Sequence, residues 1–222
     1  MVRQQRSERT RRNLIRAASA VFDRSGYERA TLSAISARAQ VTKGALFFHF
    51  AAKSDIARAV QAEACATSGA ALASLTRLEA PAFEIATAMA HALVGLLETD
   101  ATVRAGIRLT HEIRTPDDPS LHCHSAWLGA LNTILARARD DGSLLPDVDV
   151  GTAAALMLSM ITGTTTLPRS PSAPAPGDGR QGERRDSGER APGRPSSQAP
   201  ATLWLTRMLH LTRPSLSPLP TT

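Results

Sequence analysis

Polar side chains suited to phosphate and base contacts are concentrated in the N-terminal quarter of the chain. The chain holds 26 Lys and Arg residues, yet its only two lysines are Lys43 and Lys53. Thr31 and Thr42 precede stretches with helical patterning, and His49 lies between the two lysines. Hydroxyl, ammonium and imidazole groups at helix starts can donate hydrogen bonds to phosphate, alongside backbone N–H groups. These residue types indicate nucleic-acid binding.

The residues after Lys43 fit a helix that enters a DNA groove. Gly44 has no side chain, so the start of the helix can approach the groove closely, and Ala45 presents a methyl group to the bases. We expect four apolar side chains to form the core behind this helix: Ile35, Leu46, Phe48 and Phe50.

Positive charge is confined to the same quarter. Residues 1–60 carry 12 Lys and Arg against 4 Asp and Glu, whereas the remainder carries 14 against 16, and the whole chain has a net charge of +6. Clustered cations release counterions from phosphates, so a basic face beside a neutral remainder is typical of DNA-binding proteins. A basic face that is only solvated would carry the same charge.

Helical patterning predicts a helix-turn-helix in this quarter. Apolar residues recur at helical spacing from Ser7 to Arg24, and Gly26 is expected to end that helix. Thr31 is expected to cap a second short helix, and Thr42 a third that begins at Lys43. Two short helices this close together, behind a longer one, form a helix-turn-helix.

The residues from Gly26 to Ile56 resemble the DNA-binding domain of the tetracycline-repressor (TetR) family. Lys-Gly-Ala-Leu from Lys43, followed by an aromatic residue, Phe-His-Phe and a lysine, is similar to the γ-butyrolactone receptors of actinomycetes. The resemblance implies an all-α homodimer that binds double-stranded DNA. It implies DNA contacts at Thr31, Thr42, Lys43, Gly44, Ala45, Phe47, His49 and Lys53. The receptors usually carry Tyr in place of Phe47, and the lost hydroxyl removes a hydrogen bond worth about 1 kcal/mol.

The rest of the chain is expected to form a helical body. Periodicity and Pro, Gly and Asp punctuation predict helices at roughly 53–77, 81–98, 102–114, 120–139 and 149–166. By the resemblance, this body holds a small-molecule ligand, and helices at about 149–166 and 201–212 form the dimer interface. Trp127, Leu131 and Ile134 share one helix face, which suits either a ligand pocket or the core.

Composition divides the chain into four parts. We expect a helix-turn-helix domain over residues 1–52, a ligand-binding body over 53–167 and a C-terminal dimerisation helix over 201–213. Residues 168–200 are rich in Pro, Gly and Arg and contain no Val, Ile, Leu, Met or aromatic residue. Nothing in that segment can be buried to offset its ordering entropy, so we expect a disordered loop there.

Several other function classes find little support. Aromatic residues make up 4% of the chain, which disfavours a β-sandwich or barrel. Because there is no Gly-rich phosphate loop, nucleophile elbow or paired-carboxylate motif, we expect neither an enzyme nor a cofactor. His122-Cys123-His124 is a weak metal candidate, since no second Cys/His cluster accompanies it, and we expect no bound metal.

The expected cellular compartment and the expected redox state of the cysteines agree with each other. The N-terminus lacks the apolar segment of a signal peptide and no stretch of about 18 apolar residues occurs, so we expect a cytoplasmic protein without a membrane span. Cys65 and Cys123 lie far apart in the sequence, and we expect them to be reduced, buried thiols rather than a disulfide.

These features predict a ligand-responsive transcriptional repressor. It would bind a palindromic operator as a dimer and be released by a small molecule such as a γ-butyrolactone, through two conformations of different ligand affinity. A pseudo-receptor that senses an antibiotic or a biosynthetic intermediate would share these features and is the alternative. A helical enzyme or scaffold with an incidental helix-turn-helix is the alternative from another class.

Overall fold

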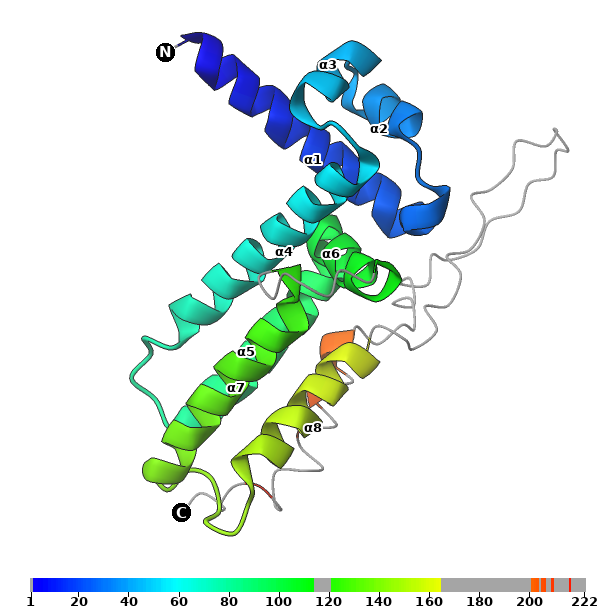
Figure 1. Ribbon diagram of the computed structural model, residues 1–222. Coiled ribbons are helices and arrows are strands. Elements are labelled where there is room, and N and C mark those ends of the chain that lie inside the picture. Colours follow the sequence, from blue (N-terminus) through cyan, green and yellow to red (C-terminus); the bar gives the residue numbers. More distant parts are fainter. Residues whose placement is uncertain are drawn as a thin grey trace, which may run out of the picture.

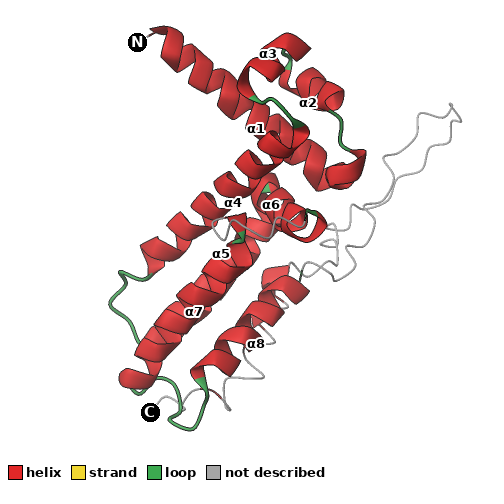
Figure 2. Ribbon diagram, in the orientation of Figure 1, coloured by secondary structure: helices red, strands yellow, loops and turns green. Residues whose placement is uncertain are grey.

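The computed structural model describes residues 2–113, 121–164, 201–203, 205, 206, 209 and 216. Helices are the only regular elements in these ranges, and no strand occurs among them (Figure 2). The predicted all-α class is therefore confirmed. The expected loop at 168–200 lies outside the described residues.

The helices form two units that meet at α6 and at the start of α4 (Figure 1). The N-terminal unit consists of α1 (Val2–Arg29), α2 (Leu32–Ala39) and α3 (Lys43–His49). In the body, α6 packs on α1 and on α4, α5 and α7 pack on α4, and α8 packs on α7 and α5 (Figure 1). The body helices are α4 (Lys53–Leu75), α5 (Ala82–Thr99), α6 (Ala101–Glu112), α7 (Cys123–Asp140) and α8 (Val150–Gly163).

The ends of the short helices follow the capping residues in the sequence. Thr31 is the N-cap of α2 and accepts a hydrogen bond from the backbone N–H of Ala34 at 3.1 Å. Thr42 is the N-cap of α3 and accepts one from Ala45 at 3.2 Å. Each hydroxyl satisfies a backbone donor that the first helical turn leaves without a partner, so both predicted caps are confirmed.

Gly26 interrupts α1 as its position predicts. Its φ of 74° and ψ of 175° are not helical, and the chain resumes a short helical segment that ends at Arg29. Glycine reaches this positive φ at little cost because it has no Cβ. The break turns the end of α1 toward α6, which is where the N-terminal unit contacts the body.

Two hydrophobic cores hold the fold together. The core of the N-terminal unit includes Leu14 and Phe22 of α1, and it also takes in Ala105 and Leu109 of α6. The core of the body surrounds α5, on which nine residues are buried. Because α6 supplies residues to the first core, burial of apolar surface fixes the N-terminal unit to the body.

α5 (Ala82–Thr99) is long and apolar enough to cross a membrane by length and composition. Half of this helix is buried against other helices of the protein. Packing in the core of the body therefore accounts for its apolar composition.

The expectation of two reduced thiols is wrong in this structure. Cys65 of α4 and Cys123 at the start of α7 form a disulfide, with Cα atoms 5.0 Å apart. Their sequence separation of 58 residues concealed this proximity, because only the packing of α4 on α7 brings the two positions together. Cys123 is buried, as expected, whereas Cys65 is partly exposed.

Candidate functional site

The first turn of α3 presents an open, polar surface. Thr42, Lys43 and Gly44 are all exposed, and Ala45 is half-buried. A Cβ built on Gly44 would have Thr42 Oγ1, 4.0 Å away, as its nearest neighbour. A groove wall could therefore approach this helix start without meeting another side chain.

The two faces of α3 differ in burial. Leu46 and Phe50 are buried in the core of the N-terminal unit, as is Ile35 of α2, so these three predictions are confirmed. The prediction that Phe48 is a core residue is wrong, since its side chain is 81% exposed. Leu46 lies on the inner face of α3, and Phe50, the extended C-cap residue that follows the helix, is buried in the same core, whereas Phe48 is exposed to solvent.

Two further aromatic groups extend the exposed face of α3. Phe47 is 51% exposed, and the half-buried His49 makes an edge contact with Phe48, with ring centroids 5.2 Å apart. Exposed phenylalanines cost hydrophobic free energy unless a partner covers them. The α3 surface is thus both basic and apolar, which suits contact with phosphates and thymine methyl groups.

A groove lined by arginines lies beside this face, and the sequence did not lead us to predict it. It has a volume of about 630 Å³, and its lining includes Val41 of the α2–α3 turn and Asn13, whose Nδ2 donates to the Ala39 carbonyl at 2.8 Å. Its cations are Arg6, Arg9, Arg12 and Arg16 of α1. Their spacing of three or four residues places them on one helix face, a signal that the sequence already contained.

Lys53 is engaged within the protein in this structure. Its Nζ donates to the backbone carbonyls of Tyr27, Glu28 and Ala30 at 2.9 to 3.3 Å and lies 4.3 Å from the centre of the Tyr27 ring. A cation at the C-terminal end of a helix satisfies its last carbonyls and opposes the negative end of the helix dipole. Lys53 therefore fastens the start of α4 to the end of α1, and its contact with DNA stays a prediction.

Ion pairs join α1 to α6 next to the break at Gly26. Nε and Nη2 of Arg104 donate to the Asp23 carboxylate at 2.9 to 3.2 Å, with both side chains about one quarter exposed. Arg108 donates to the Asp23 carbonyl at 2.9 Å and to Glu112 at 2.6 Å. Glu112 also accepts a hydrogen bond from the backbone N–H of Tyr27. These bonds connect the orientation of the N-terminal unit to the position of α6.

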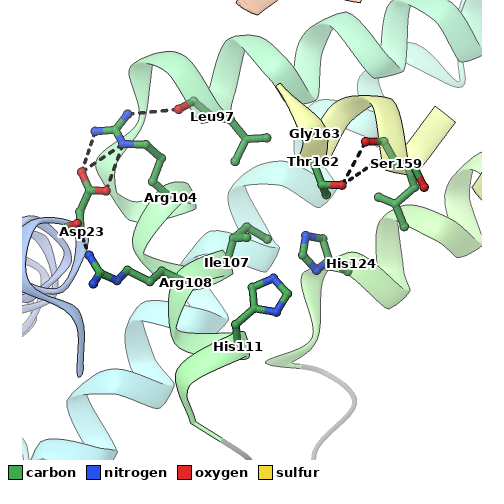
Figure 3. A pocket seen from close by; sticks show the side chains of 11 residues that line it. Asp23, Leu97, Arg104, Ile107, Arg108, His111, His124, Ser159, Thr162 and Gly163 are labelled. Carbon is green, nitrogen blue, oxygen red and sulfur yellow. Dashed lines mark hydrogen bonds and ion pairs between the residues drawn. The ribbon is translucent and has the colours of Figure 1, made fainter. Parts of the chain in front are cut away.

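A cavity of about 770 Å³ opens beside these ion pairs, between α6, the start of α7 and the end of α8 (Figure 3). Leu97, Ile107 and Leu158 give it an apolar lining. His111 and His124 lie next to each other on its wall, with ring centroids 5.2 Å apart. Burial, reinforced by the neighbouring His111, lowers the pKa of His124. Nε2 of His124 is buried without a hydrogen-bond partner among the described residues.

The three residues expected to contact a ligand share one buried face of α7. Trp127 is 1% exposed, and its Nε1 donates to Ser68 Oγ of α4 at 2.9 Å. Leu131 and Ile134 lie in the same core. None of the three lines the α6–α8 cavity, although His124 of that cavity makes an edge contact with Trp127, with centroids 5.5 Å apart. Their role in ligand binding stays a prediction.

A metal site finds no support in the described part of the chain, where no group of three His, Cys, Asp or Glu side chains could hold an ion. In the His122-Cys123-His124 sequence, the sulfur belongs to the disulfide and His124 contacts His111. These neighbours on the chain therefore do not converge on one point.

Comparison with known proteins agrees with this architecture. Residues 14–60 match the model of the family described as "Bacterial regulatory proteins, tetR family". The chain is 35% identical over 168 residues to the A-factor receptor protein of Streptomyces griseus, a match that covers 73% of this chain and 56% of that protein. The chain thus spans little more than half the length of this curated relative.

Two solved structures extend the comparison. A γ-butyrolactone receptor described as ArpA-like is 27% identical, with a TM-score of 0.71, over 97% of this chain and 91% of that one. CprB of Streptomyces coelicolor, solved with its operator sequence, is 33% identical, with a TM-score of 0.64, over 71% of this chain and 81% of that one. On this fold and these identities, the chain belongs to the tetR family of bacterial regulatory proteins.

Proposed function

We propose that the protein is a transcriptional repressor that binds a palindromic DNA operator as a homodimer and is released by a small molecule. The observation that carries the proposal is the exposed start of α3, where the N-cap Thr42, Lys43 and an open Gly44 face outward beside the arginine groove of α1. A helix with this surface fits the major groove, while the α1 arginines reach phosphates. The relatives named as receptors of A-factor and of γ-butyrolactone support the ligand-responsive part.

A dimer follows from the symmetry that a palindromic operator requires. The outer face of α8 suits this contact, since Leu156 is 39% exposed and small residues adjoin it at Ala155 and Ser159. Leu203, also 39% exposed, lies in the described part of the predicted C-terminal helix. We infer that α8 and the helix around residues 201–213 form the interface, as the resemblance implies.

The ligand is proposed to act on the wall formed by Trp127, Leu131 and Ile134. In the structure this wall is closed, because Ser68 accepts the indole hydrogen bond. A ligand with one polar oxygen and an alkyl chain could replace Ser68 at the indole N–H and separate α7 from α4. Since α4 begins at Lys53, which fastens it to the N-terminal unit, such a movement would change the spacing of the two α3 helices in the dimer.

Operator binding is the experiment that tests the proposed repressor. DNA upstream of the protein's own coding region would be searched for an inverted repeat and titrated with the purified full chain, with fluorescence anisotropy as the readout. We expect binding of one dimer per repeat, with an affinity that falls steeply as salt increases. Equal affinity for the repeat and for scrambled DNA at every salt concentration would exclude a sequence-specific repressor.

The ligand part is tested with Trp127→Ala and Ser68→Ala, using a γ-butyrolactone as the probe. If Trp127 is chiefly a ligand contact, Trp127→Ala keeps its fold and its operator binding but is not released by the lactone. Ser68→Ala removes only the closing hydrogen bond and is expected to respond at lower lactone concentration. If the Trp127→Ala protein is still released from the operator at the lactone concentration that releases the wild type, Trp127 is not part of the ligand site.

The same proposal places the protein in the cytoplasm, where operator DNA is found, and assigns it no enzymatic reaction. Its relatives are named as regulators and receptors, which supports a binding role. Release by an antibiotic or a biosynthetic intermediate, and not by a lactone, would identify the pseudo-receptor alternative.

A further inference from the structure

We propose that Cys65 and Cys123 form a redox-active modification site, whose substrates are small thiols and peroxides, and that its oxidised form makes the protein insensitive to the releasing ligand. The inference rests on the proposed ligand-released repressor and adds a chemical control to it. These residues are the only two cysteines of the chain, and they join α4 to α7 across 58 residues of sequence. In the cytoplasm, where the proposed function places the protein, disulfides are uncommon and those that form are usually transient and redox-sensing.

The disulfide lies beside the hydrogen bond that closes the proposed ligand site. Cys65 and Ser68 are three residues apart on α4. Cys123 and Trp127 are four residues apart on α7, so each pair shares one helix face. Trp127 Nε1 donates to Ser68 Oγ at 2.9 Å, and the Cα atoms of the two cysteines are 5.0 Å apart. Two cross-links, one covalent and one a hydrogen bond, therefore join the same faces of α4 and α7.

Only the covalent cross-link resists the ligand. A ligand oxygen that takes the indole N–H from Ser68 replaces one hydrogen bond with another, so the exchange costs little net free energy. The same ligand cannot break the bond between Cys65 and Cys123. While that bond is intact, α7 cannot leave α4, and the ligand has no open conformation to select. Reduction of the bond makes that conformation available.

Access to solvent decides which sulfur reacts. Cys65 is partly exposed, whereas Cys123 is 0% exposed. A thiolate from solvent therefore attacks the sulfur of Cys65, and the sulfur of Cys123 leaves as a thiolate that takes up a proton. A second thiolate of the reductant then attacks the reductant's own sulfur in the mixed disulfide and releases Cys65 as a thiol. The protein gains two electrons and two protons, and the two thiols of the reductant become a disulfide.

A peroxide reverses the reaction. The thiol of Cys65 attacks hydrogen peroxide and becomes a sulfenic acid, with release of one water. The thiol of Cys123 then attacks the sulfur of Cys65, the S–O bond breaks and a second water leaves. The buried position suits both states, because Sγ of Cys123 lies 3.9 Å from the Gln61 carbonyl oxygen, which can accept the thiol proton after reduction.

Thiol exchange in the folded protein tests the chemistry. The native full chain would be reduced with dithiothreitol, returned with hydrogen peroxide, and alkylated with iodoacetamide at each stage for mass spectrometry. We expect two thiols after reduction and none after peroxide. With peroxide and glutathione, Cys123→Ala should form a mixed disulfide at Cys65, and Cys65→Ser should form about tenfold less, because Cys123 is buried. Thiols that appear only in denaturant, or equal amounts of mixed disulfide on the two variants, would overturn the site.

Quenching of Trp127 fluorescence by acrylamide tests whether the bond holds α4 and α7 together. Trp204→Phe leaves Trp127 as the only tryptophan. Trp127 is 1% exposed, so the oxidised protein should be quenched weakly, and reduction should raise the quenching constant about twofold or more through local opening. Cys65→Ser in the same background should match the reduced protein, with or without peroxide. Equal quenching of the oxidised and reduced proteins would overturn the constraint on α7.

Release from the operator is the functional readout. Reduced wild type and Cys65→Ser should leave the inverted repeat at γ-butyrolactone concentrations about tenfold or more below the concentration that releases the oxidised wild type. Peroxide-treated Cys65→Ser is the matched control, because peroxide also oxidises methionines but forms no bond in this variant. Equal release concentrations for the oxidised and reduced wild type would overturn the control of the ligand response.

The thiol and quenching measurements contain neither DNA nor lactone. Their failure would therefore overturn the redox site and leave the repressor proposal intact. Absence of operator binding, or of release by the lactone in both redox states, would contradict the proposed function instead, and the redox site would then stand or fall on thiol exchange and quenching.

Discussion

A Cβ atom on Gly26 would lie 2.7 Å from Oε1 of Glu112, so the break in α1 and the end of α6 occupy one closely packed joint. The same atom would lie 2.6 Å from Nη2 of Arg108. Gly26 thus meets two requirements: a positive φ that turns the chain, and the absence of a side chain where the Arg108–Glu112 ion pair of α6 packs against it.

Gly26→Ala is expected to disturb this joint more than backbone strain alone would. Gly142 is a matched control, because its φ is +76° but a Cβ there would meet nothing within 4 Å. Gly142→Ala should cost about 1 to 2 kcal/mol of unfolding free energy, from the conformation alone. Gly26→Ala should cost more and also weaken operator binding. Equal losses in urea unfolding, with operator affinity intact in both variants, would contradict a role for the joint.

Acid is expected to weaken the same joint through Glu112. Burial on its own raises the pKa of Glu112, but hydrogen bonds from the Tyr27 backbone and the Arg108 guanidinium outweigh it, so the pKa is lowered in the folded protein. The group therefore stabilises the fold above the pKa of about 4.3 of an unfolded glutamate, and this stabilisation is lost as pH falls through the lower folded value.

Glu112→Gln should accordingly flatten the dependence of unfolding free energy on pH between about 5 and 3. The measurement is urea unfolding across that range, for the wild type and the variant. Glu79→Gln, at an exposed position in the loop between α4 and α5, is the control substitution. A Glu112→Gln profile parallel to the wild type would show that the carboxylate does not stabilise the fold.

How much the sequence could predict is seen best at α3 and at Lys53. Caps and apolar spacing depend on local sequence, so the caps at Thr31 and Thr42 and the buried Leu46 followed from it. Whether Phe48 faces the core or solvent depends on where α1 and α2 pack against the seven-residue α3. The neighbouring aromatic residues led to the prediction of a buried Phe48, which is wrong. Lys53 bonds to carbonyls more than 20 residues away, a contact that only the folded chain creates.

Phe47→Tyr is expected to strengthen operator binding. Phe47 is 51% exposed on α3, so a hydroxyl added to its ring can reach phosphate at no cost to the core. One added hydrogen bond is worth about 1 kcal/mol, or roughly fivefold in affinity. Phe48→Tyr adds the same group to a neighbouring exposed ring and is the control. Anisotropy titrations that give equal gains, or no gain, for both variants would argue against a phosphate beside Phe47.

Lys43→Ala and Lys53→Ala should separate DNA contact from helix capping. Lys43 is exposed at the start of α3, so its loss should lower operator affinity and alter sequence preference while the melting temperature is kept. Lys53→Ala removes the donors to three carbonyls of the α1 end and should lower the melting temperature as well.

The salt dependence of binding decides whether Lys53 also touches DNA. A phosphate contact predicts that Lys53→Ala reduces the slope of log affinity against log salt by about one, uniformly across sequences. An unchanged slope with reduced stability would assign Lys53 to the α1–α4 joint alone. Unchanged DNA-binding isotherms for both lysine variants, with intact folding, would show that the exposed surface of α3 is not the DNA-binding site.

Cys65→Ser and reduction of the disulfide should destabilise the body by similar amounts. The bond closes a separation of 58 residues between α4 and α7, and it lies on the same two helices as the hydrogen bond from Trp127 to Ser68. Loss of a disulfide of this loop length costs about 2 to 4 kcal/mol of unfolding free energy, largely because the unfolded chain gains freedom. Thiol titration in denaturant, before and after reduction, measures whether the bond is present. Two reactive thiols in the unreduced protein would contradict the disulfide. No reactive thiol before reduction and two after it would establish the bond. Urea unfolding of the unreduced and reduced samples then gives the contribution of the bond to stability.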